Sequence, residues 1–351
     1  MKSLFRRIGI NTISLLEFLK KEKIYRSGKI NLKRIKLLSK GFYSLGLVPF
    51  DFDNYSYSDY ISDFENIKLS YLNYPYGRLL RDKLVFSLFF KNFCNLPEIF
   101  GIINNGKVQS VTRVIESDGF DYLKEILVKK KIILKPRFGT GGQGIIKVAP
   151  AADGKYSINN KILSEEEFVN FISKLNDYIA VEFIQQSTFS EFFFPDSTNT
   201  IRITTYCNPK TNEGEILYSL MRFGRTKSAP ADNVGAGGIY SLIDINTGKL
   251  KQAIELGENG KYTFHKSHPD TKVNIVDVKI PQWDKLKHSF KNLASLISPY
   301  IKFAGWDIIL TEDSYYLIEG NNGLELYIQG PSYPLAKSDS FLKFIKTNSI
   351  R

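Results

Sequence analysis

Short apolar runs and segments of helical periodicity succeed one another along the chain. Apolar runs at 131–137 and 145–148 flank a glycine-rich stretch, and further strands are predicted at 178–184, 200–207, 215–223 and 238–245. Helices are predicted from Arg81 towards Pro97, near 121–130 and over 283–300, and a β-hairpin over 304–321. The pattern lacks the regular β-α-β alternation of a Rossmann domain. It therefore predicts a mixed α+β protein with mainly antiparallel sheets.

One helix start is marked by a capping box. Ser164 precedes three glutamates, so its hydroxyl can accept from the amide of Glu167 while the Glu167 carboxylate reaches back. Phe168, Ile172 and Leu175 follow on one helical face. The sequence therefore predicts an amphipathic helix that begins at this point.

The first forty residues carry most of the positive charge. The chain has a formal net charge of +12, and eight lysines and four arginines against Glu17 and Glu22 give 12 − 2 = +10 through Lys40. Apolar residues interleave with these charges at helical spacing, namely Leu4, Phe5, Ile8, Leu15, Leu16 and Leu19. One hypothesis is a basic amphipathic helix that makes peripheral contact with an anionic membrane through residues 1–40. The alternative is a solvated helical arm whose apolar face packs on the core.

Several classes of function are disfavoured by the rest of the composition. No nucleic-acid module accompanies the basic segment, so we expect no nucleic-acid partner. Cys94 and Cys207 have no CxxC spacing, which argues against zinc and haem and favours a reducing compartment. No apolar run reaches the length of a membrane span. We expect a cytoplasmic protein, attached at most peripherally at the inner membrane face.

The glycine-rich stretch KIILKPRFGTGGQGIIKV (131–148) is the first candidate for a ligand site. Its glycines free the backbone to curl over a ligand, and successive amides of such a turn can hold phosphate oxygens. The strand period places Lys135 and Arg137 on one side, where both cations could reach that ligand. The stretch is neither a Walker loop nor a Rossmann fingerprint. The alternative is a flexible hairpin turn with solvated cations.

The second candidate is the hairpin GWDIILTEDSYYLIEGN (305–321). If its turn is centred on Asp313, Asp307 and Glu319 lie opposite each other, and Asn321 shares the face of Glu319. Two carboxylates so placed would repel each other unless a cation lay between them, and oxygen ligands suit Mg²⁺. The alternative is a solvated hairpin edge.

Together the two hairpins resemble the ATP-grasp superfamily. More narrowly, RFGRTKSAPADNVGAGGI, IDINTGKL and GWDIILTEDSYYLIEGN are similar to the sugar-transfer-associated ATP-grasp family found with bacterial surface-polysaccharide genes, over roughly residues 82–330. The resemblance implies an α+β ATP-grasp fold with nucleotide held between two subdomains. We expect a basic helical extension at 1–80, an N-terminal subdomain at 81–130, a lid at 131–185 and a C-terminal subdomain with the metal site at 186–351.

The resemblance also assigns residues to ATP and Mg²⁺. The expected nucleotide contacts are Lys83, Lys135, the loop Gly139, Thr140, Gly141, Gly142, Gln143 and Gly144, the adenine hinge Glu182, Phe183 and Ile184, and Glu191 at the ribose. The expected metal ligands are Asp307, Glu319 and Asn321. Glu182 could instead be an ordinary exposed strand residue.

Three arginines are the expected catalytic residues. Arg202, Arg222 and Arg225 lie on or beside predicted core strands, where a cation is costly unless an anion meets it. We expect them to bind the γ-phosphate, the acyl phosphate and the substrate carboxylate, although structural salt bridges could explain any one of them. A substrate-side loop is expected at Asp232, Asn233, Gly237 and Gly238.

These assignments predict an ATP-dependent carboxylate–amine ligase that forms an amide through an acyl phosphate. The expected substrates are an amino acid and a sugar acid or amino sugar, lipid-linked or nucleotide-linked, in capsule or O-antigen biosynthesis. The alternatives are a peptide or polyglutamate-type ligase, a kinase that phosphorylates a hydroxyl, and a catalytically silent nucleotide-binding scaffold. No catalytic base is evident, and the oligomeric state is not predicted.

Overall fold

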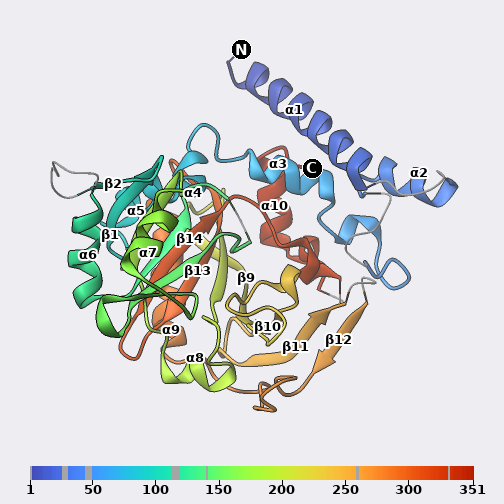
Figure 1. Ribbon diagram of the computed structural model, residues 1–351. Coiled ribbons are helices and arrows are strands. Elements are labelled where there is room, and N and C mark those ends of the chain that lie inside the picture. The colour runs from blue at the N-terminus through green and yellow to red at the C-terminus, as the bar shows by residue number, and fades with distance from the viewer. Residues whose placement is uncertain are drawn as a thin grey trace. The chain divides into compact units, whose positions relative to one another are not determined.

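The computed structural model describes residues 2–25, 31–43, 50–111, 119–139, 141–257, 261–330 and 333–351, with the side chains of residues 2–8 and 25 excluded. The chain forms two compact units, each discontinuous in sequence (Figure 1). The first unit comprises residues 1–77, 192–307 and 320–351, and the second comprises residues 78–191 and 308–319.

The second unit is built on a seven-stranded sheet in the order β2-β1-β7-β3-β4-β5-β6, in which neighbouring strands run antiparallel. Its strands are β1 (Ile99–Asn104), β2 (Lys107–Ser110), β3 (Ile132–Pro136), β4 (Ile146–Pro150), β5 (Tyr156–Ile158), β6 (Lys161–Leu163) and β7 (Tyr178–Glu182). Its helices are α4 (Arg78–Arg81), α5 (Lys83–Phe90), α6 (Phe120–Lys129), the short η2 (Ala152–Gly154), α7 (Glu165–Ile172) and the start of α8 (Thr188–Phe193).

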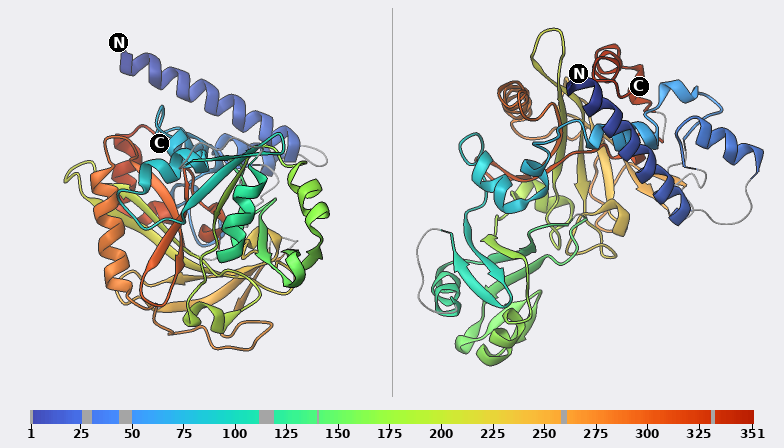
Figure 2. Two further views of the ribbon diagram at one scale, coloured as in Figure 1. Left: turned by 60° about the vertical axis from the view of Figure 1, so that its left-hand side comes forward. Right: turned by 90° about the horizontal axis from the view of Figure 1, so that it is seen from above.

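The two faces of this sheet carry different cores because strand side chains alternate. Leu134 packs with Leu123 and Leu127 of α6 and with Phe168 of α7 on one face. The ribbons of these helices and strands can be followed by colour in Figure 2. The opposite face holds a smaller cluster in which Ile133 contacts buried Ile179, Val181 and Ile99, together with Leu84 of α5. The sheet is therefore held between α6 and α7 on one side and α5 on the other.

The second seven-stranded sheet has the order β12-β11-β10-β9-β8-β13-β14, and most of its strands belong to the first unit, whereas residues 308–319 of β13, the hairpin turn and β14 belong to the second. Its strands are β8 (Ile201–Cys207), β9 (Gly214–Phe223), β10 (Ile239–Ile243), β11 (Leu250–Leu256), β12 (Tyr262–His265), β13 (Phe303–Leu310) and β14 (Tyr315–Asn321). The helices of the first unit are α1 (Lys2–Tyr25), α2 (Leu32–Ser39), η1 (Tyr57–Asp59), α3 (Asp63–Ser70), η3 (Val234–Ala236), α9 (Trp283–Leu296), η4 (Leu326–Gln329), η5 (Leu335–Lys337) and α10 (Asp339–Thr347).

Helix α10 covers one face of this sheet and α9 covers the other. Tyr206 of β8 and Phe303 of β13 belong to the buried cluster of Phe341 and Phe344 in α10. The opposite face carries Trp306, whose ring lies 6.4 Å from that of Phe290 in α9. Residues of β8 and β13 that share a face with Tyr206 or Phe303 therefore point to the α10 side, a placement that decides the position of the site described below.

The expected mixed α+β class with mainly antiparallel sheets is confirmed. The capping box also forms, because Ser164 Oγ accepts from Glu167 N–H at 3.2 Å and the Glu167 carboxylate accepts from Ser164 N–H at 2.8 Å. The sequence analysis did not predict β2, β5, β6, β11, β12, α8 or α10. Strands from residues 81–130 and from residues 131–185 lie in one and the same sheet. The expected division of the chain into an extension, an N-terminal subdomain, a lid and a C-terminal subdomain stays a prediction.

Candidate active site

The glycine-rich loop connects β3 to β4 and takes a backbone that favours glycine. Gly139, Gly141, Gly142 and Gly144 have positive φ angles of 124°, 75°, 73° and 73°. A Cβ atom on Gly144 would also lie only 2.9 Å from the hydroxyl of Tyr178. Gln143 lies within this turn, and Thr140 lies outside the described residues. The loop geometry therefore depends on the glycines that marked it in the sequence.

Two lysines of the second unit lie close to each other near this loop, of which Lys83 is buried and Lys135 partly buried. Lys83, the first residue of α5, donates from Nζ to the carbonyl oxygen of Gly139 at 2.8 Å. Lys135 of β3 donates from Nζ to the carbonyl oxygen of Ile318 at 3.4 Å. Glu319 Oε1 lies 3.9 Å from Lys83 Nζ. Residues far apart in sequence thus place two ammonium groups and one carboxylate together.

The electrostatics of this lysine pair favour an anionic ligand. Burial lowers the pKa of Lys135 to about 8; Glu319 partly opposes this effect, and the positive charge of Lys83 adds to it. Among the described residues, the carboxylate placed near both ammonium groups is that of Glu319. The cluster therefore carries excess positive charge that a phosphate could balance.

Arg137 does not join Lys135, which differs from the expectation that both cations reach the ligand. Its Nε and Nη2 donate to the carboxylate of Asp82 at 2.8 and 2.6 Å. Asp82 also caps α5 by accepting from the N–H groups of Leu84 and Val85. Burial raises the pKa of Asp82, but Arg137 and these two amides outweigh burial and lower it. Strand β3 ends at Pro136, so the two-residue period no longer sets the direction of Arg137.

The expected adenine hinge follows β7 in the same unit. Glu182, the last residue of β7, pairs with Ile132 of β3 and lies 3.6 Å from Lys130 Nζ. The ring of Phe183 lies 4.4 Å from Lys147 Nζ, and Ile184 is buried. Glu191 accepts a hydrogen bond from the side chain of Gln185. The nucleotide roles of these residues stay predictions.

A buried network of arginines and carboxylates lies on the α10 side of the sheet in the first unit. Arg202 of β8 shares its strand face with Tyr206, and Asp307 of β13 shares its face with Phe303. Arg202 donates to both carboxylate oxygens of Asp307, the Nη2–Oδ2 distance being 2.8 Å. Arg222 Nη2 lies 3.1 Å from the same Oδ2. Strand register therefore brings together three charged residues that the sequence placed in separate motifs.

Glu325 completes this network, and the sequence analysis missed it. Its Oε1 lies 3.0 Å from Arg202 Nη1 and 3.5 Å from Arg222 Nη1. An acid between Leu324 and Leu326 was the available signal, because an isolated charge in an apolar run requires a partner when buried. Asp232 adds a further carboxylate by accepting from Thr200 N–H at 2.8 Å and lying 3.7 Å from Arg222 Nε.

The charges within this network are balanced by side chains of the chain itself. Burial alone would raise the pKa of Asp307, but Arg202 and Arg222 outweigh burial and lower it to about 2. The two arginines therefore offset the charge of Asp307, and the structure does not require a metal ion for this purpose. Within the described part of the chain, no three His, Cys, Asp or Glu side chains are grouped to hold a metal ion.

The hairpin turn is centred between Glu312 and Asp313 because Thr311 N–H donates to Ser314 O at 3.0 Å. This centre differs by half a residue from the assumed centre at Asp313. Asn321 ends β14, and its Nδ2 is buried with no hydrogen-bond partner among the described residues. The assignment of Asp307, Glu319 and Asn321 as metal ligands stays a prediction.

Arg225 belongs to a different cluster from Arg202 and Arg222. Its Nη1 lies 2.8 Å from Glu255, and its Nη2 lies 2.9 Å from Asp270. Glu255 also contacts Lys227 at 2.6 Å and the ring of His265 at 3.0 Å. The sequence analysis missed this group because its members come from separate strands and loops.

The expected substrate loop forms a tight turn around η3. Asn233 accepts from Gly235 N–H at 2.9 Å, and Gly237 has a φ angle of 101°. A Cβ atom on Gly238 would lie 2.5 Å from the carbonyl oxygen of Asp232. The loop is therefore closely folded on itself, and its contact with substrate stays a prediction.

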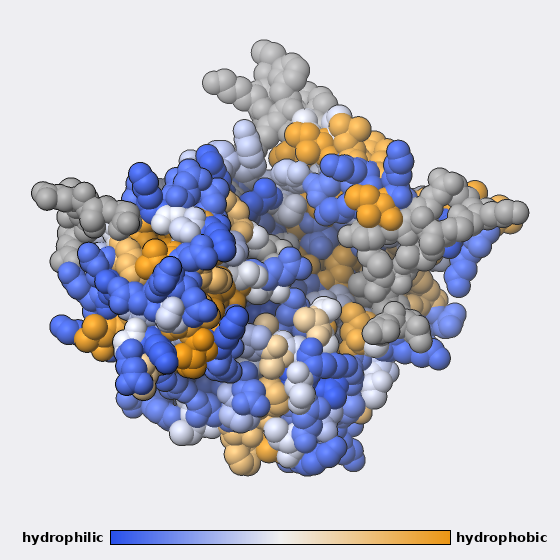
Figure 3. Space-filling view, viewed as in Figure 1, coloured by the Kyte–Doolittle hydropathy of each residue, from blue (hydrophilic) through white to orange (hydrophobic). Residues whose placement is uncertain are grey.

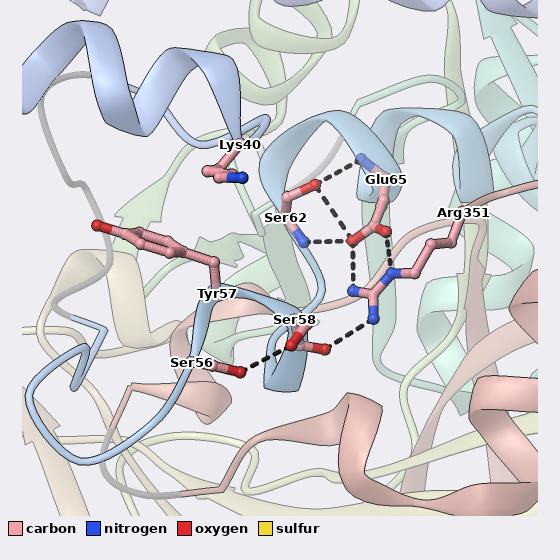
Figure 4. Close-up of a pocket in the computed structure, with 7 residues that line it drawn as sticks. All are labelled: Lys40, Ser56, Tyr57, Ser58, Ser62, Glu65 and Arg351. Atoms are coloured by element: carbon pink, nitrogen blue, oxygen red, sulfur yellow. Dashed lines mark hydrogen bonds and ion pairs between the residues drawn. The ribbon is translucent and has the colours of Figure 1, made fainter.

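A polar cavity of about 330 Å³ lies elsewhere in the first unit (Figure 4). Its lining residues are Lys40, Ser56, Tyr57, Ser58, Ser62, Glu65 and Arg351. Figure 4 shows Arg351 turned towards Glu65, to which it donates from Nη2 at 3.0 Å, and towards Ser58, whose carbonyl oxygen accepts from Nη1 at 2.7 Å. These hydrogen bonds hold Arg351 against Glu65 of α3 at the wall of the cavity.

A family model described as sugar-transfer-associated ATP-grasp matches residues 65–333. The chain is similar to D-alanyl-alanine synthetase A from Vibrio cholerae, with 10% identity over 78% of this chain and 66% of that chain and a TM-score of 0.44. It is also similar to an L-amino acid ligase from Bacillus licheniformis, with 11% identity over 83% of this chain and 54% of that chain and a TM-score of 0.41.

The chain spans about half to two thirds of the length of the solved structures that it matches. No curated protein matches the sequence.

Proposed function

Because this chain belongs to the sugar-transfer-associated ATP-grasp family, we propose that it is an ATP-dependent carboxylate–amine ligase. In this proposal it joins an amino acid to a sugar acid or amino sugar, lipid-linked or nucleotide-linked, in capsule or O-antigen biosynthesis. The reaction passes through an acyl phosphate and releases ADP and phosphate.

The observation that carries the proposal is the pair of lysines in the second unit. Lys83 contacts the glycine-rich loop and Lys135 lies close to Lys83, and among the described residues the carboxylate placed near both is that of Glu319. The lowered pKa of Lys135 indicates that its charge is not fully compensated within the chain. A nucleotide polyphosphate supplies the missing negative charge, and the amides of the loop could hold its oxygens.

Magnesium is the metal that the proposed donors suit. Carboxylate and amide oxygens of Asp307, Glu319 and Asn321 are hard ligands. The atom of Asn321 that lacks a partner among the described residues is Nδ2, a donor, which could meet a phosphate oxygen and not the metal ion. When bound there, the ion would offset negative charge on the phosphates of ATP.

The arginines are proposed to act on the substrate. A carboxylate oxygen attacks the γ-phosphorus, the bond to the bridging oxygen breaks, and ADP leaves. Arg202 and Arg222, already held in position by Asp307 and Glu325, would stabilise the acyl phosphate. The amine then attacks the acyl carbon and phosphate leaves, under a closed loop that excludes water.

Nucleotide binding tests the first step without knowledge of the substrate. Calorimetric titration with ADP and magnesium chloride should show binding to the wild type. Lys135→Met removes one cation at similar volume, so we expect affinity to fall by at least about tenfold. Lys129→Met changes an exposed lysine at the end of α6 and serves as the matched control. Equal affinities in all three proteins would contradict the lysine assignment.

Turnover tests the ligase against its alternatives. Amino acids would be screened with uronic acids and amino sugars for ADP release, and products identified by mass spectrometry. ADP released only when acid and amine are both present supports the ligase. A product of two amino acids would instead identify a peptide ligase, and a stable phosphorylated product a kinase. Nucleotide binding without turnover across the screen would favour the scaffold.

A further inference from the structure

Helix α1 buries polar residues and exposes aliphatic ones, which is the reverse of an ordinary surface helix. The side chains of Ser14 and Glu22 are buried together with Phe18. Phe18 stacks on Tyr43 with ring centroids 4.9 Å apart, and Glu17 accepts from the hydroxyl of Tyr71, the residue directly after α3, at 2.8 Å. Phe18 and Glu17 on the inner side of α1 therefore have partners within the protein, whereas the hydroxyl of Ser14 has none among the described residues.

The apolar outer face of α1 consists of Ile13, Leu16, Leu19 and Ile24, which are 49%, 63%, 53% and 68% exposed. At 100° per residue these positions lie on the side of the helix away from Ser14 and Phe18. Figure 3 shows apolar residues gathered along α1 with hydrophilic residues beside them. Leu4, Phe5 and Ile8 have side chains outside the described residues, so the outer face is defined without them.

Lysines border this apolar face. Lys20 and Lys23 are exposed between Leu16 and Ile24 on the same side of the helix. Helix α2 repeats the combination, since Leu32 and Ile35 are exposed among basic residues and α2 has no buried residue. Long lysine stems can lie along an apolar surface while the ammonium group reaches the charged layer above it.

We propose that α1 and α2 dock the protein on the anionic surface of a lipid bilayer. The apolar outer face of α1 enters the headgroup layer, and exposed lysines of the two helices, namely Lys20, Lys23 and Lys33, pair with lipid phosphates. The segment of residues 1–40 carries +10 of the +12 net charge, so its charge complements an anionic surface. Within the described residues, no helix is long and apolar enough to span a membrane, and the proposal is of docking in the interface.

Charge also argues against a second copy of this chain as the occupant. Two copies that met through the same face would bring Lys20 and Lys23 of each towards the basic segment of the other. Such like charges repel in an isologous contact. The inference does not depend on the ligase activity, because it uses no residue of the candidate active site.

Vesicle sedimentation with the full chain tests the proposal. The wild type should bind vesicles of phosphatidylcholine mixed with phosphatidylglycerol much more tightly than pure phosphatidylcholine vesicles. Added salt should weaken the binding, because exposed charges are screened. Equal binding to both vesicle types, or to neither, would overturn the proposal.

Point variants separate the apolar and the electrostatic contributions. Leu16→Ser with Leu19→Ser should weaken binding by about tenfold or more, and Lys20→Gln with Lys23→Gln by roughly fivefold for each lysine. Val128→Ser with Leu296→Ser alters two exposed aliphatic residues elsewhere and should not change it. Unaltered thermal unfolding in every variant would show that the fold persists.

Two results would contradict the assignment of this face to lipid. One is full vesicle binding by the Leu16→Ser, Leu19→Ser variant. The other is a wild type that does not bind vesicles but forms a dimer, by light scattering, that the same variant loses. The second result would identify the face as a protein interface.

Discussion

At the residue scale, Lys135 is a partly buried cation whose charge depends on pH near neutrality. Burial lowers its pKa to about 8, so the free chain begins to lose this charge slightly below that pH. If the charged form binds phosphate, nucleotide binding must restore the proton at higher pH. The protonation state of one side chain would then set the pH range of nucleotide binding.

We therefore expect ADP affinity to fall between about pH 7 and about pH 9, by up to about tenfold per pH unit above the pKa. Lys135→Arg keeps its charge throughout this range and should flatten the profile. Calorimetric titrations at several pH values would measure both, and the variant corrects for titration of the nucleotide itself. Parallel profiles in the two proteins would contradict the assignment.

Asp307 and Glu319 should respond differently to loss of charge, although both are proposed metal ligands. Asp307→Asn leaves Arg202 and Arg222 buried with less negative charge, so the free energy of unfolding should fall by about 3 kcal/mol. Glu319 lies 3.9 Å from Lys83 and is partly exposed, so Glu319→Gln should cost about 1 kcal/mol or less.

Chemical denaturation of both variants measures this difference, and ADP titration measures their binding. Equal stability of the Asp307→Asn variant and the wild type would show that the buried network does not depend on this carboxylate. A stable Glu319→Gln variant with weakened ADP binding would assign Glu319 to the ligand and not to the fold.

At the element scale, the sequence predicted features that depend on neighbouring residues. Helix α7 begins at its capping box because Ser164 and Glu167 are three residues apart and need no distant partner. The role of Arg137 could not be predicted, since Asp82 lies 55 residues away and is joined to it only by folding. Glu325 was missed for the same reason, because its partners come from β8 and β9. Local pattern thus predicted the elements better than the charge pairs between them.

The start of α3 contains a carboxyl group that opposes folding at neutral pH. Burial raises the pKa of Asp63 to about 6, with a further contribution from Glu22 of α1, although Tyr43 N–H donates to Asp63 at 2.9 Å. The folded pKa lies above the unfolded value, so the protein loses stability as pH rises from about 4 through about 6 and this carboxyl group ionises. Above that range the ionised carboxylate lowers the free energy of unfolding by up to about 3 kcal/mol.

Asp63→Asn keeps an acceptor for Tyr43 N–H and removes the charge. We expect it to raise the melting temperature at about pH 8 and to leave it nearly unchanged at about pH 4. Thermal unfolding at both pH values measures the effect, with Asp313→Asn in the exposed hairpin turn as the control. A loss of stability at the higher pH would contradict the unfavourable charge.

At the scale of the whole molecule, the second unit needs a segment that is distant in sequence. Residues 308–319 contribute to it through Ser187 N–H, which donates to Leu310 O, and Leu317 N–H, which donates to Asn95 O, both at 2.8 Å. Lys135 also contacts Ile318 O. A fragment of residues 78–191 lacks these partners, so it should unfold at a lower temperature than the same unit in the full chain.

A synthetic peptide of residues 308–319 should raise the melting temperature of that fragment, whereas a scrambled peptide should not. Circular dichroism during heating measures both. Full stability of the fragment without the peptide would show that 308–319 is dispensable for this unit.

The discontinuity of the second unit also affects its synthesis. Residues 78–191 leave the ribosome well before 308–319, with residues 192–307 translated in between. Domains generally fold as they emerge, from the N-terminus onwards. Here the second unit cannot form the hydrogen bonds of Ser187 N–H and Asn95 O until the hairpin has been translated. During translation this interval is when the chain would most need a chaperone.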